Sequence, residues 1–403
     1  MLKIKQIQKQ KRRVLIANHA NWEGISRLPY LLSSADFSVD VISPKENFIA
    51  QSSFLENHYP VPDHVESVVD FLRNHLSLNK NTYDQVIIGD DPLLYALCRI
   101  SHETWVKEIL PCNPDADSVE FISSKIEFIT KAHQHGICVP DFEICANKYQ
   151  LDLATARLGF PVVLKKSEGF GGGSIFFIKN QEELDNFRVA EPVVAQKFIE
   201  GRTVSVAALY DHGTLCAYYS YYRHRTSGLF GVSTAIKFKI FHDLEIILKG
   251  LGQISGFNGI SGIDLIEDDK SGKLYLLEKN FRPTLTILIG KYVGVDLINM
   301  IKKISANFIF NTPIRQIDKS GKIVPIFPGD VLRAIDKLDL IGLIRWLFFP
   351  NYWREICWYD LKLLIFNFKY IMNFAFRSFA HACKGIFLNV IAWIKNWMTL
   401  AGS

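Results

Sequence analysis

The residues with the clearest chemical potential stand in one segment, GISGIDLIEDDKSGKLYLLEKNFRPT at positions 259–284. Its two halves alternate apolar and polar residues around a turn-forming DDKSGK, so the segment is predicted to form a β-hairpin. A turn centred in DDKSGK places Asp264 opposite Glu278, and Asn280 shares the face of Glu278 because strand side chains alternate. Magnesium prefers such oxygen ligands, and Arg282 is placed to neutralise a phosphoryl group. The simpler alternative is a solvated sheet face.

A second candidate is the run KKSEGFGGGS at 165–174, which separates two strand-like stretches at 160–166 and 175–179. Walker and dinucleotide-binding loops lead from a strand into a helix, and this run lacks GK[ST] and has Ser174 where a last glycine would stand. A glycine-rich hairpin can instead fold its amides over phosphate oxygens, because glycine allows close backbone approach. A mobile surface loop is the alternative, and Lys165 favours the phosphate interpretation.

Two further groups are candidates for substrate contacts. Arg223, His224 and Arg225 could bind a carboxylate or a phosphate, or could simply solvate a sheet edge. His19 and Glu23 follow the first predicted strand, where a wound sheet exposes its carboxyl ends, although a plain loop role is the simpler interpretation.

The elements that position these residues come from a chain of 403 residues, long enough for two or three domains. Apolar runs at 13–18, 39–43 and 85–89 alternate with helical patterns at 65–76 and 92–100. This alternation predicts a wound parallel sheet, and the hairpins that follow it predict antiparallel sheets. The expected fold class is therefore α/β and α+β multidomain.

Composition narrows the class of protein. Hydrophobic residues make up 48% and charged residues 22% of the chain, which indicates a globular protein. The seven cysteines occur singly and without metal-ligand spacing, which favours reduced thiols and a cytoplasmic location. A helix over 123–136 followed by Pro140 marks a domain boundary. The body before the basic tail is nearly neutral, so no nucleic-acid partner is expected.

The basic tail differs from the body. After Asp360 there is no acidic residue, and a helix over 361–403 would keep five basic residues in one stripe on an otherwise apolar, aromatic surface. Such a helix lies in a membrane interface as a peripheral anchor, or docks on the catalytic body or a second subunit. The basic residues are Lys362, Lys369, Arg377, Lys384 and Lys395.

The order of Lys125, the run around Lys165, VVAQKFIEG at 193–201, GISGID with Asp264, and LLEKNFRPT resembles the ATP-grasp superfamily. The resemblance is to the branch with biotin carboxylase, carbamoyl-phosphate synthetase and carboxylate-amine ligases, over about residues 14–303. Five elements in order are far more specific than any one of them.

The resemblance implies three parts. These are a wound preATP-grasp domain at 1–115, an ATP-grasp domain at 116–315 with a lid at about 140–200, and a helical, amphipathic extension at 316–403. ATP would be clamped between the lid and the larger antiparallel part. A homo-oligomer is an option within this architecture.

The resemblance also implies roles for single residues. Asp264, Glu278 and Asn280 match the magnesium ligands, with manganese an option, while Arg282 and Lys165 match the groups that act on the acyl-phosphate. The nucleotide-contacting positions are Lys125, Lys165, Gly169, Gly171, Gly172, Gly173, Ser174, Gln196, Lys197, Phe198, Ile199 and Thr203. The stretch from Gln196 to Ile199 would face the adenine.

Two positions depart from the family pattern. Thr203 stands where many relatives have a ribose-binding glutamate, so either Glu200 substitutes or the ribose is held differently. Gln196 stands where a glutamate is common, and its amide oxygen can still accept from the adenine amino group. Neither change touches the phosphate or metal positions.

The resemblance implies an ATP- and magnesium-dependent ligase. A substrate carboxylate would attack the γ-phosphorus of ATP, and an amine would then displace phosphate from the acyl-phosphate. The partners would be small-molecule acids and amines. The alternative is a nucleotide-binding regulator of the same fold that does not ligate.

Overall fold

The computed structural model describes residues 11–169, 173–228 and 231–379, and the chain divides into two compact units. Unit 1 carries sheets and helices, and the described part of unit 2 is mainly helical. The finer division predicted from sequence, with boundaries after 115 and 315, stays a prediction. Unit 1 is Met1–Arg223 and Lys237–Lys322, and unit 2 is His224–Ile236 and Ile323–Ser403.

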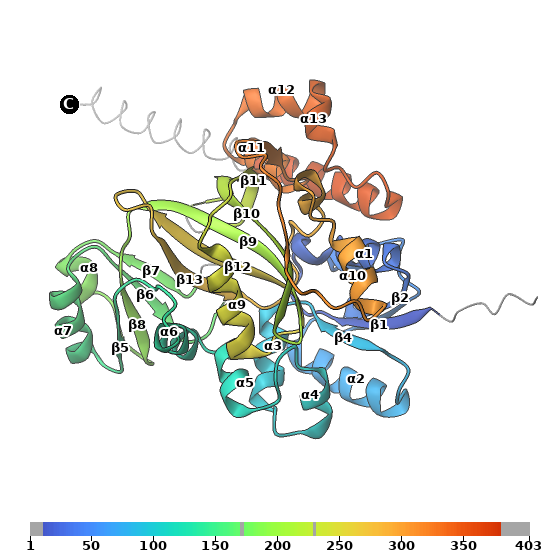
Figure 1. Cartoon of the computed structure of the whole chain (residues 1–403). Helices are drawn as coiled ribbons and strands as arrows, with labels where there is room; N and C mark the ends of the chain where they lie inside the picture. The colour runs from blue at the N-terminus through green and yellow to red at the C-terminus, as the bar shows by residue number, and fades with distance from the viewer. Residues whose placement is uncertain (1–10, 170–172, 229–230, 380–403) are drawn as a thin grey trace, which may run out of the picture. The chain divides into compact units, whose positions relative to one another are not determined.

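Unit 1 begins with a four-stranded parallel sheet covered by helices. Its elements are β1 (Arg12–Ala17), β2 (Phe37–Pro44), β3 (Asn57–Val61), β4 (Gln85–Ile88), α1 (Leu28–Ser34), α2 (Val65–Leu78) and α3 (Asp91–Arg99), with 3-10 helices η1 (Glu23–Ile25) and η2 (Phe48–Gln51). The strand order is β3-β2-β1-β4, and Figure 1 shows α1 and α2 on opposite sides of the sheet. The predicted wound parallel sheet is confirmed.

One strand of this sheet has no counterpart among the predicted elements. β3 contains Pro60 and has mainly polar or half-exposed residues, so it lacks the apolar alternation that predicts a strand. It lies at the edge of the sheet, where a proline is tolerated because one side of the strand needs no ladder partner.

Three helices follow: α4 (Thr104–Ile109), α5 (Ala116–Ser123) and α6 (Lys125–Gln134). The predicted helix over 123–136 therefore begins later, at Lys125. Ser124 interrupts the chain with an extended backbone, and its hydroxyl accepts a hydrogen bond from the Glu127 amide at 3.2 Å. This N-cap fixes Lys125 at the first position of α6.

The second sheet of unit 1 is antiparallel, in the order β5-β8-β6-β7. Its strands and helices are β5 (Phe142–Cys145), β6 (Val162–Lys166), β7 (Ile175–Ile178), β8 (Val193–Lys197), α7 (Lys148–Leu158) and α8 (Gln181–Asp185). β6 and β7 pair with Lys165 opposite Ile175, so the lysine-glycine run joins two strands as predicted. Leu151, Leu164 and Ala195 belong to its small core.

The third sheet carries the acidic hairpin. Its elements in unit 1 are β9 (Gly201–Asp211), β12 (Gly259–Asp268), β13 (Leu274–Asn280) and β14 (Ile314–Arg315), with α9 (Leu244–Ser255), η3 (Ile289–Val293) and α10 (Leu297–Ser305). β10 (Thr214–Thr226) and β11 (Ser233–Phe238) run from one unit into the other. The order β13-β12-β9-β10 is antiparallel. The antiparallel prediction is confirmed.

Unit 2 is organised around the buried carboxylate of Asp330. Arg225 donates to it from Nε and Nη2, both at 2.8 Å, and Arg333 and the Trp346 indole each donate at 3.1 Å. A small apolar core that includes Phe327, Trp346 and Leu363 surrounds this network. The described elements are β15 (Ile323–Pro325), α11 (Gly329–Asp336), α12 (Leu340–Phe348), α13 (Pro350–Trp353) and a helical stretch at 361–379.

Candidate active site

The acidic hairpin has the predicted register. Asp264 on β12 lies opposite Glu278 on β13, and Gly262 lies opposite Asn280. The Asn280 amide donates to Asp264 Oδ2 at 3.4 Å, and the Ser205 hydroxyl on β9 donates to Asp264 Oδ1 at 2.5 Å. The two carboxylates and the Asn280 side chain therefore lie on neighbouring strands, with the Asn280 amide nitrogen toward Asp264 and its oxygen toward Arg282. Carboxylate and amide oxygens are the ligands that hard cations prefer.

The turn of this hairpin explains why the register holds. Asp268 accepts hydrogen bonds from the Lys270 amide at 3.0 Å and the Ser271 hydroxyl at 2.6 Å, and Gly272 has φ 69°. A positive φ favours glycine, so the DDKSGK sequence closes the turn without strain. A shift between Asp264 and Leu265 marks an irregularity beside the carboxylates.

Two lysines from other elements lie at the end of β13 near Glu278, and one of them contacts its carboxylate. Lys125 Nζ lies 3.8 Å from Glu278 Oε1, and Lys165 Nζ donates to the Leu277 carbonyl at 2.9 Å. Burial lowers the pKa of Lys165 to about 8 although Glu278 opposes the change, and burial likewise lowers the pKa of Lys125. Burial also raises the pKa of Glu278 against the attraction of both lysines. The site thus holds opposite charges in a weakly hydrated space.

The glycine-rich loop closes on Lys125. The Lys125 ammonium donates to the Gly169 carbonyl at 2.6 Å and to the Ser174 hydroxyl at 2.7 Å. Gly169 has φ 130°, and a Cβ there would lie 2.5 Å from Ser174 Oγ, so glycine is required by both backbone and space. Gly173 is exposed, while Gly171 and Gly172 lie outside the described residues.

The predicted adenine-facing stretch continues from β8. Gln196 is buried, and among the described residues its Nε2 has no hydrogen-bond partner. It lines one pocket together with Lys125, Lys165 and Glu278. A buried amide nitrogen without a partner is costly unless a ligand satisfies it, so this donor fits a nucleotide base.

The remaining nucleotide-contacting candidates lie around Gln196. Lys197 is exposed, with Nζ 3.7 Å from Asp141, and the ring of Phe198 lies 5.0 Å from that of Phe177. Ile199 and Thr203 are half-buried, and Thr203 pairs with Ile266 across β9 and β12. Glu200 is exposed.

Arg282 is held by residues that the motif does not reveal. Its Nε donates to Asp91 at 2.8 Å, its Nη2 donates to Asn280 at 3.2 Å, and its guanidinium lies 4.3 Å from the centre of the Trp22 ring. Asp91, Trp22 and Ser205 were not among the site residues predicted from the sequence. Lys279, another buried lysine, has a pKa lowered to about 8 by burial.

Of the weaker candidates, Arg225 differs from expectation. Arg225 is committed to Asp330 in unit 2, so it neither solvates a sheet edge nor offers its charge to a substrate. His19 Nε2 lies 3.5 Å from Asp63, and burial raises the pKa of Glu23 to about 7. Among the described residues, no three histidine, cysteine, aspartate or glutamate side chains form a metal-binding group.

A parallel sheet, a small antiparallel sheet bearing a lysine and glycine loop, and an acidic hairpin are together the arrangement of an ATP-grasp fold. Residues 122–286 match the family model described as the ATP-grasp domain. Residues 122–286 therefore form an ATP-grasp domain, and the chain is similar to ATP-dependent ligases such as carbamoyl-phosphate synthase. Ligases of this superfamily generally use ATP and magnesium.

Individual relatives agree with this assignment. Carbamoyl-phosphate synthase from Methanobrevibacter smithii is 26% identical over 279 residues, which cover 63% of this chain and 74% of that protein. Other matched relatives include the carbamoyl phosphate synthase large chains of Caldanaerobacter subterraneus and Thermomicrobium roseum. The matched segments cover only 17% and 24% of those proteins.

Solved structures share the fold at low identity. N5-carboxyaminoimidazole synthetase from Staphylococcus aureus, complexed with ADP, has a TM-score of 0.62 at 14% identity and covers 82% of this chain and 86% of its own. The biotin carboxylase domain of the 2-oxoglutarate carboxylase of Hydrogenobacter thermophilus, solved with MgADP and bicarbonate, has a TM-score of 0.59 at 16% identity. That match covers 75% of this chain and 71% of the other.

Proposed function

We propose that this protein binds ATP and magnesium at the acidic hairpin, activates a substrate carboxylate as an acyl-phosphate and joins it to an amine. The observation that carries the proposal is the convergence of two buried lysines with Asp264 and Glu278 beneath a glycine loop. A ligase that forms an acyl-phosphate needs cationic groups on the phosphates and oxygen ligands for the metal, and this site holds both.

The lysines would hold the triphosphate. Lys125 already donates to two oxygens of the closing loop, Gly169 O and Ser174 Oγ, and phosphate oxygens would take the place of these acceptors. Lys165 would regain its full positive charge beside a phosphate, because an anion offsets the cost of burial. The unpaired amide of Gln196 would face the base.

The metal would be held by Asp264, Glu278 and Asn280, with phosphate oxygens and water completing its shell. When bound, magnesium would neutralise charge on the phosphates and orient the γ-phosphoryl group. Ser205 would keep Asp264 in one orientation by donating to Oδ1, which leaves Oδ2 toward Asn280. Manganese accepts the same ligands.

The reaction is balanced without a protein nucleophile. A carboxylate oxygen attacks the γ-phosphorus, the bond to the bridging oxygen breaks, and ADP leaves. The amine nitrogen then attacks the acyl carbon, phosphate departs and the nitrogen loses a proton. Arg282, steadied by Asp91, would stabilise the negative charge that develops on the transferred group.

The substrates would approach from the loop after β1. Asn18 Oδ1, His19 Nδ1 and Trp22 Nε1 are buried and have no hydrogen-bond partner among the described residues. Trp22 stacks on Arg282, so this loop borders the proposed reaction centre. Unsatisfied buried polar atoms at the carboxyl edge of a parallel sheet are where a polar substrate would bind.

The protein would work at a membrane surface through unit 2. Within 337–379 the acidic side chains are Asp339, Glu355 and Asp360, and none of them is exposed. The exposed charges of this part are all basic. Its exposed large apolar side chains include Leu340, Ile341, Ile344, Leu347, Phe348, Leu361, Ile365, Phe368, Met372, Phe376 and Phe379.

This combination fits an anionic lipid interface better than a protein partner. Aromatic and long apolar side chains enter the headgroup region while lysine and arginine attract acidic lipids. The basic side chains that carry this attraction are Arg345, Arg354, Lys362, Lys369 and Arg377. The predicted positions Lys384 and Lys395 lie outside the described residues, and no helix in the described part of the chain is long and apolar enough to span a bilayer.

A regulator that closes on ATP without ligation is the competing function. ADP release measured with a panel of carboxylic acids and amines separates the two. The ligase predicts that at least one acid stimulates release and that Glu278→Gln abolishes it. If Glu278→Gln abolishes ATP turnover but no acid stimulates it in the unmodified protein, the regulator explains the result better than the ligase.

A further inference from the structure

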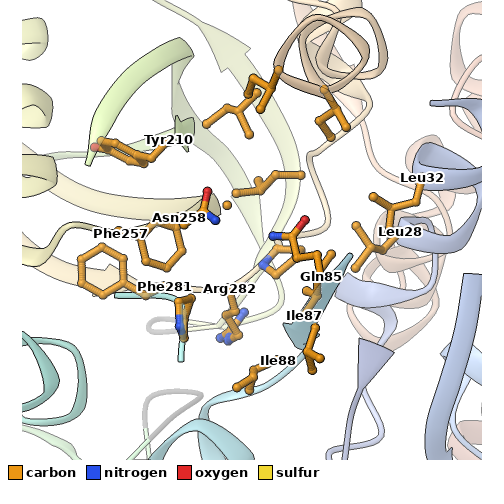
Figure 2. A pocket seen from close by; sticks show the side chains of 18 of the residues that line it. Leu28, Leu32, Gln85, Ile87, Ile88, Tyr210, Phe257, Asn258, Phe281 and Arg282 are labelled. Carbon is orange, nitrogen blue, oxygen red and sulfur yellow. The ribbon is translucent and has the colours of Figure 1, made fainter. Parts of the chain in front are cut away.

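A second pocket in unit 1 borders the proposed reaction centre without belonging to it. Its cavity has a volume of about 90 Å³ and opens to solvent. Arg282 lines it, but Asp91 and Asn280, which accept from the Arg282 guanidinium, do not. Figure 2 shows the pocket with Leu28 and Leu32 on one side and Phe257 and Tyr210 on the other.

The walls are mainly apolar. Leucine and isoleucine side chains come from α1, β4, β9, β12 and α10, and phenylalanine side chains come from β2 and from the segments after α9 and β13. Apolar walls that carry a few polar groups are typical of small-molecule sites. Representative wall residues are Leu28, Leu32, Ile88, Ile260, Phe281 and Ile304.

One wall is the free edge of a strand. In the part of the chain that the structure describes, β4 pairs with β1 alone and lies at the end of its sheet. All four residues of β4, Gln85 to Ile88, line the pocket, although alternate side chains point to opposite faces of the sheet. The pocket therefore runs along the strand edge, where backbone amides and carbonyls can pair with an extended amide-bearing chain.

The polar groups of the walls specify the ligand further. The Tyr210 hydroxyl already donates to Leu248 O, and Arg282 is the one charged residue of the lining and is paired with Asp91. The side-chain amides of Gln85 and Asn258 project into the pocket in Figure 2, and no hydrogen bond to another described residue engages them. Carboxamides recognise neutral groups that both donate and accept, such as another amide.

We infer that this pocket holds the non-reacting part of the acid substrate, and that this part is apolar, uncharged and carries an amide. An N-acylated apolar amino acid or a short apolar peptide has this chemistry. Its chain would lie along β4 and its carboxylate would point to Arg282 at the pocket wall. The activation of the carboxylate rests on the proposed ligase function, but binding in the pocket does not.

Two probe molecules distinguish binding in the pocket from activation of the carboxylate. N-acetyl-leucyl-leucine carries the carboxylate, and its C-terminal amide lacks it. Titration calorimetry with the full chain, magnesium and a non-hydrolysable ATP analogue is expected to detect binding of both probes, whereas only the acid is expected to release ADP when ATP is supplied.

Variants locate the binding. Ile304→Trp fills the pocket from α10 and is expected to lower the affinity for both probes at least tenfold. Gln85→Leu removes the side-chain amide at nearly constant size and is expected to lower both affinities several-fold. Ile246→Trp is the matched control, because Ile246 is 75% exposed on α9 and does not line the pocket. Thermal unfolding of each variant checks that it folds.

The outcomes are distinct. The pocket assignment is supported if the amide probe binds, if Ile304→Trp weakens this binding and if Ile246→Trp does not. This holds whether or not the acid probe causes ADP release. Absence of binding by both probes, or binding that Ile304→Trp leaves unchanged, overturns it. ADP release by a small polar acid alone would leave the ligase function standing and reject this pocket as its acid site.

Discussion

Asp264 and Glu278 face each other across β12 and β13, and Glu278 is also the residue that Lys125 approaches to 3.8 Å. One carboxylate therefore connects the proposed metal ligands with the proposed phosphate-binding lysines. Burial raises the pKa of Glu278, and the attraction of Lys125 and Lys165 offsets this effect only in part. A divalent cation would complete that compensation.

The first prediction concerns this carboxylate pair. Asp264→Asn and Glu278→Gln each remove one negative charge at nearly constant shape, so magnesium should bind more weakly and ATP turnover should fall by roughly 100-fold or more. ADP release as a function of magnesium concentration measures both effects. Glu267→Gln is the control, because Glu267 lies on the same hairpin but pairs with Arg202. Equal activity in all three variants would remove the metal assignment.

The second prediction concerns Ser205, which positions Asp264. Ser205→Ala removes the hydrogen bond of 2.5 Å to Asp264 Oδ1, so the magnesium concentration for half-maximal rate should rise several-fold while kcat at saturating magnesium changes little. Ser205→Thr keeps the hydroxyl and should restore the magnesium dependence. A fall in kcat that saturating magnesium does not correct would contradict a positioning role.

The third prediction concerns protons. Burial lowers the pKa of Lys165 to about 8, and bound phosphates should raise it again. ATP binding at pH 8 should therefore take up roughly half a proton, and affinity should weaken as pH rises through 8, because the free protein has then lost the proton that the complex keeps.

Calorimetry in buffers of different ionisation enthalpy measures this uptake. Lys165→Gln should lose it, whereas Lys80→Gln, at an exposed position, should keep it. Proton release on binding, or the same uptake in Lys165→Gln, would be inconsistent with the assigned phosphate contact.

The fourth prediction concerns the surface of unit 2. The protein should co-sediment with vesicles of phosphatidylcholine and phosphatidylglycerol, less so with phosphatidylcholine alone, and less at high salt. Lys362→Glu combined with Lys369→Glu should reduce sedimentation at least fivefold, since both side chains are exposed and reversing their charge repels acidic lipid.

Lys80→Glu combined with Lys270→Glu reverses two exposed charges of unit 1 and serves as the control. Charge reversal is preferable to truncation here, because Leu363, Leu364 and Ile371 belong to the core of unit 2. Dimerisation in solution without vesicle binding would show that a second copy covers this face instead.

Local sequence patterns were sufficient to predict the two hairpins. Alternation and turn chemistry placed Asp264 opposite Glu278, and the strand-loop-strand arrangement of the lysine and glycine run followed from the apolar stretches on either side. These features depend on neighbours in sequence, so one sequence contains their determinants.

Contacts between residues far apart in the sequence could not be predicted from local patterns. Asp91 and Arg282 are 191 residues apart in the sequence, and Ser205 and Asp264 are 59 apart. No local periodicity therefore predicts either hydrogen bond. Arg225 was misjudged because its partner, Asp330, lies 105 residues further along the chain. β3 was missed because an edge strand with a proline needs no apolar alternation.

The acyl-phosphate itself is the most direct test of the account. Hydroxylamine intercepts an acyl-phosphate as a hydroxamate, so the protein is incubated with ATP, magnesium, hydroxylamine and a panel of carboxylic acids that includes N-acylated apolar amino acids. The account predicts that at least one acid yields hydroxamate and ADP in equal amounts, and that Glu278→Gln yields neither. ADP formation without hydroxamate from any acid would contradict carboxylate activation.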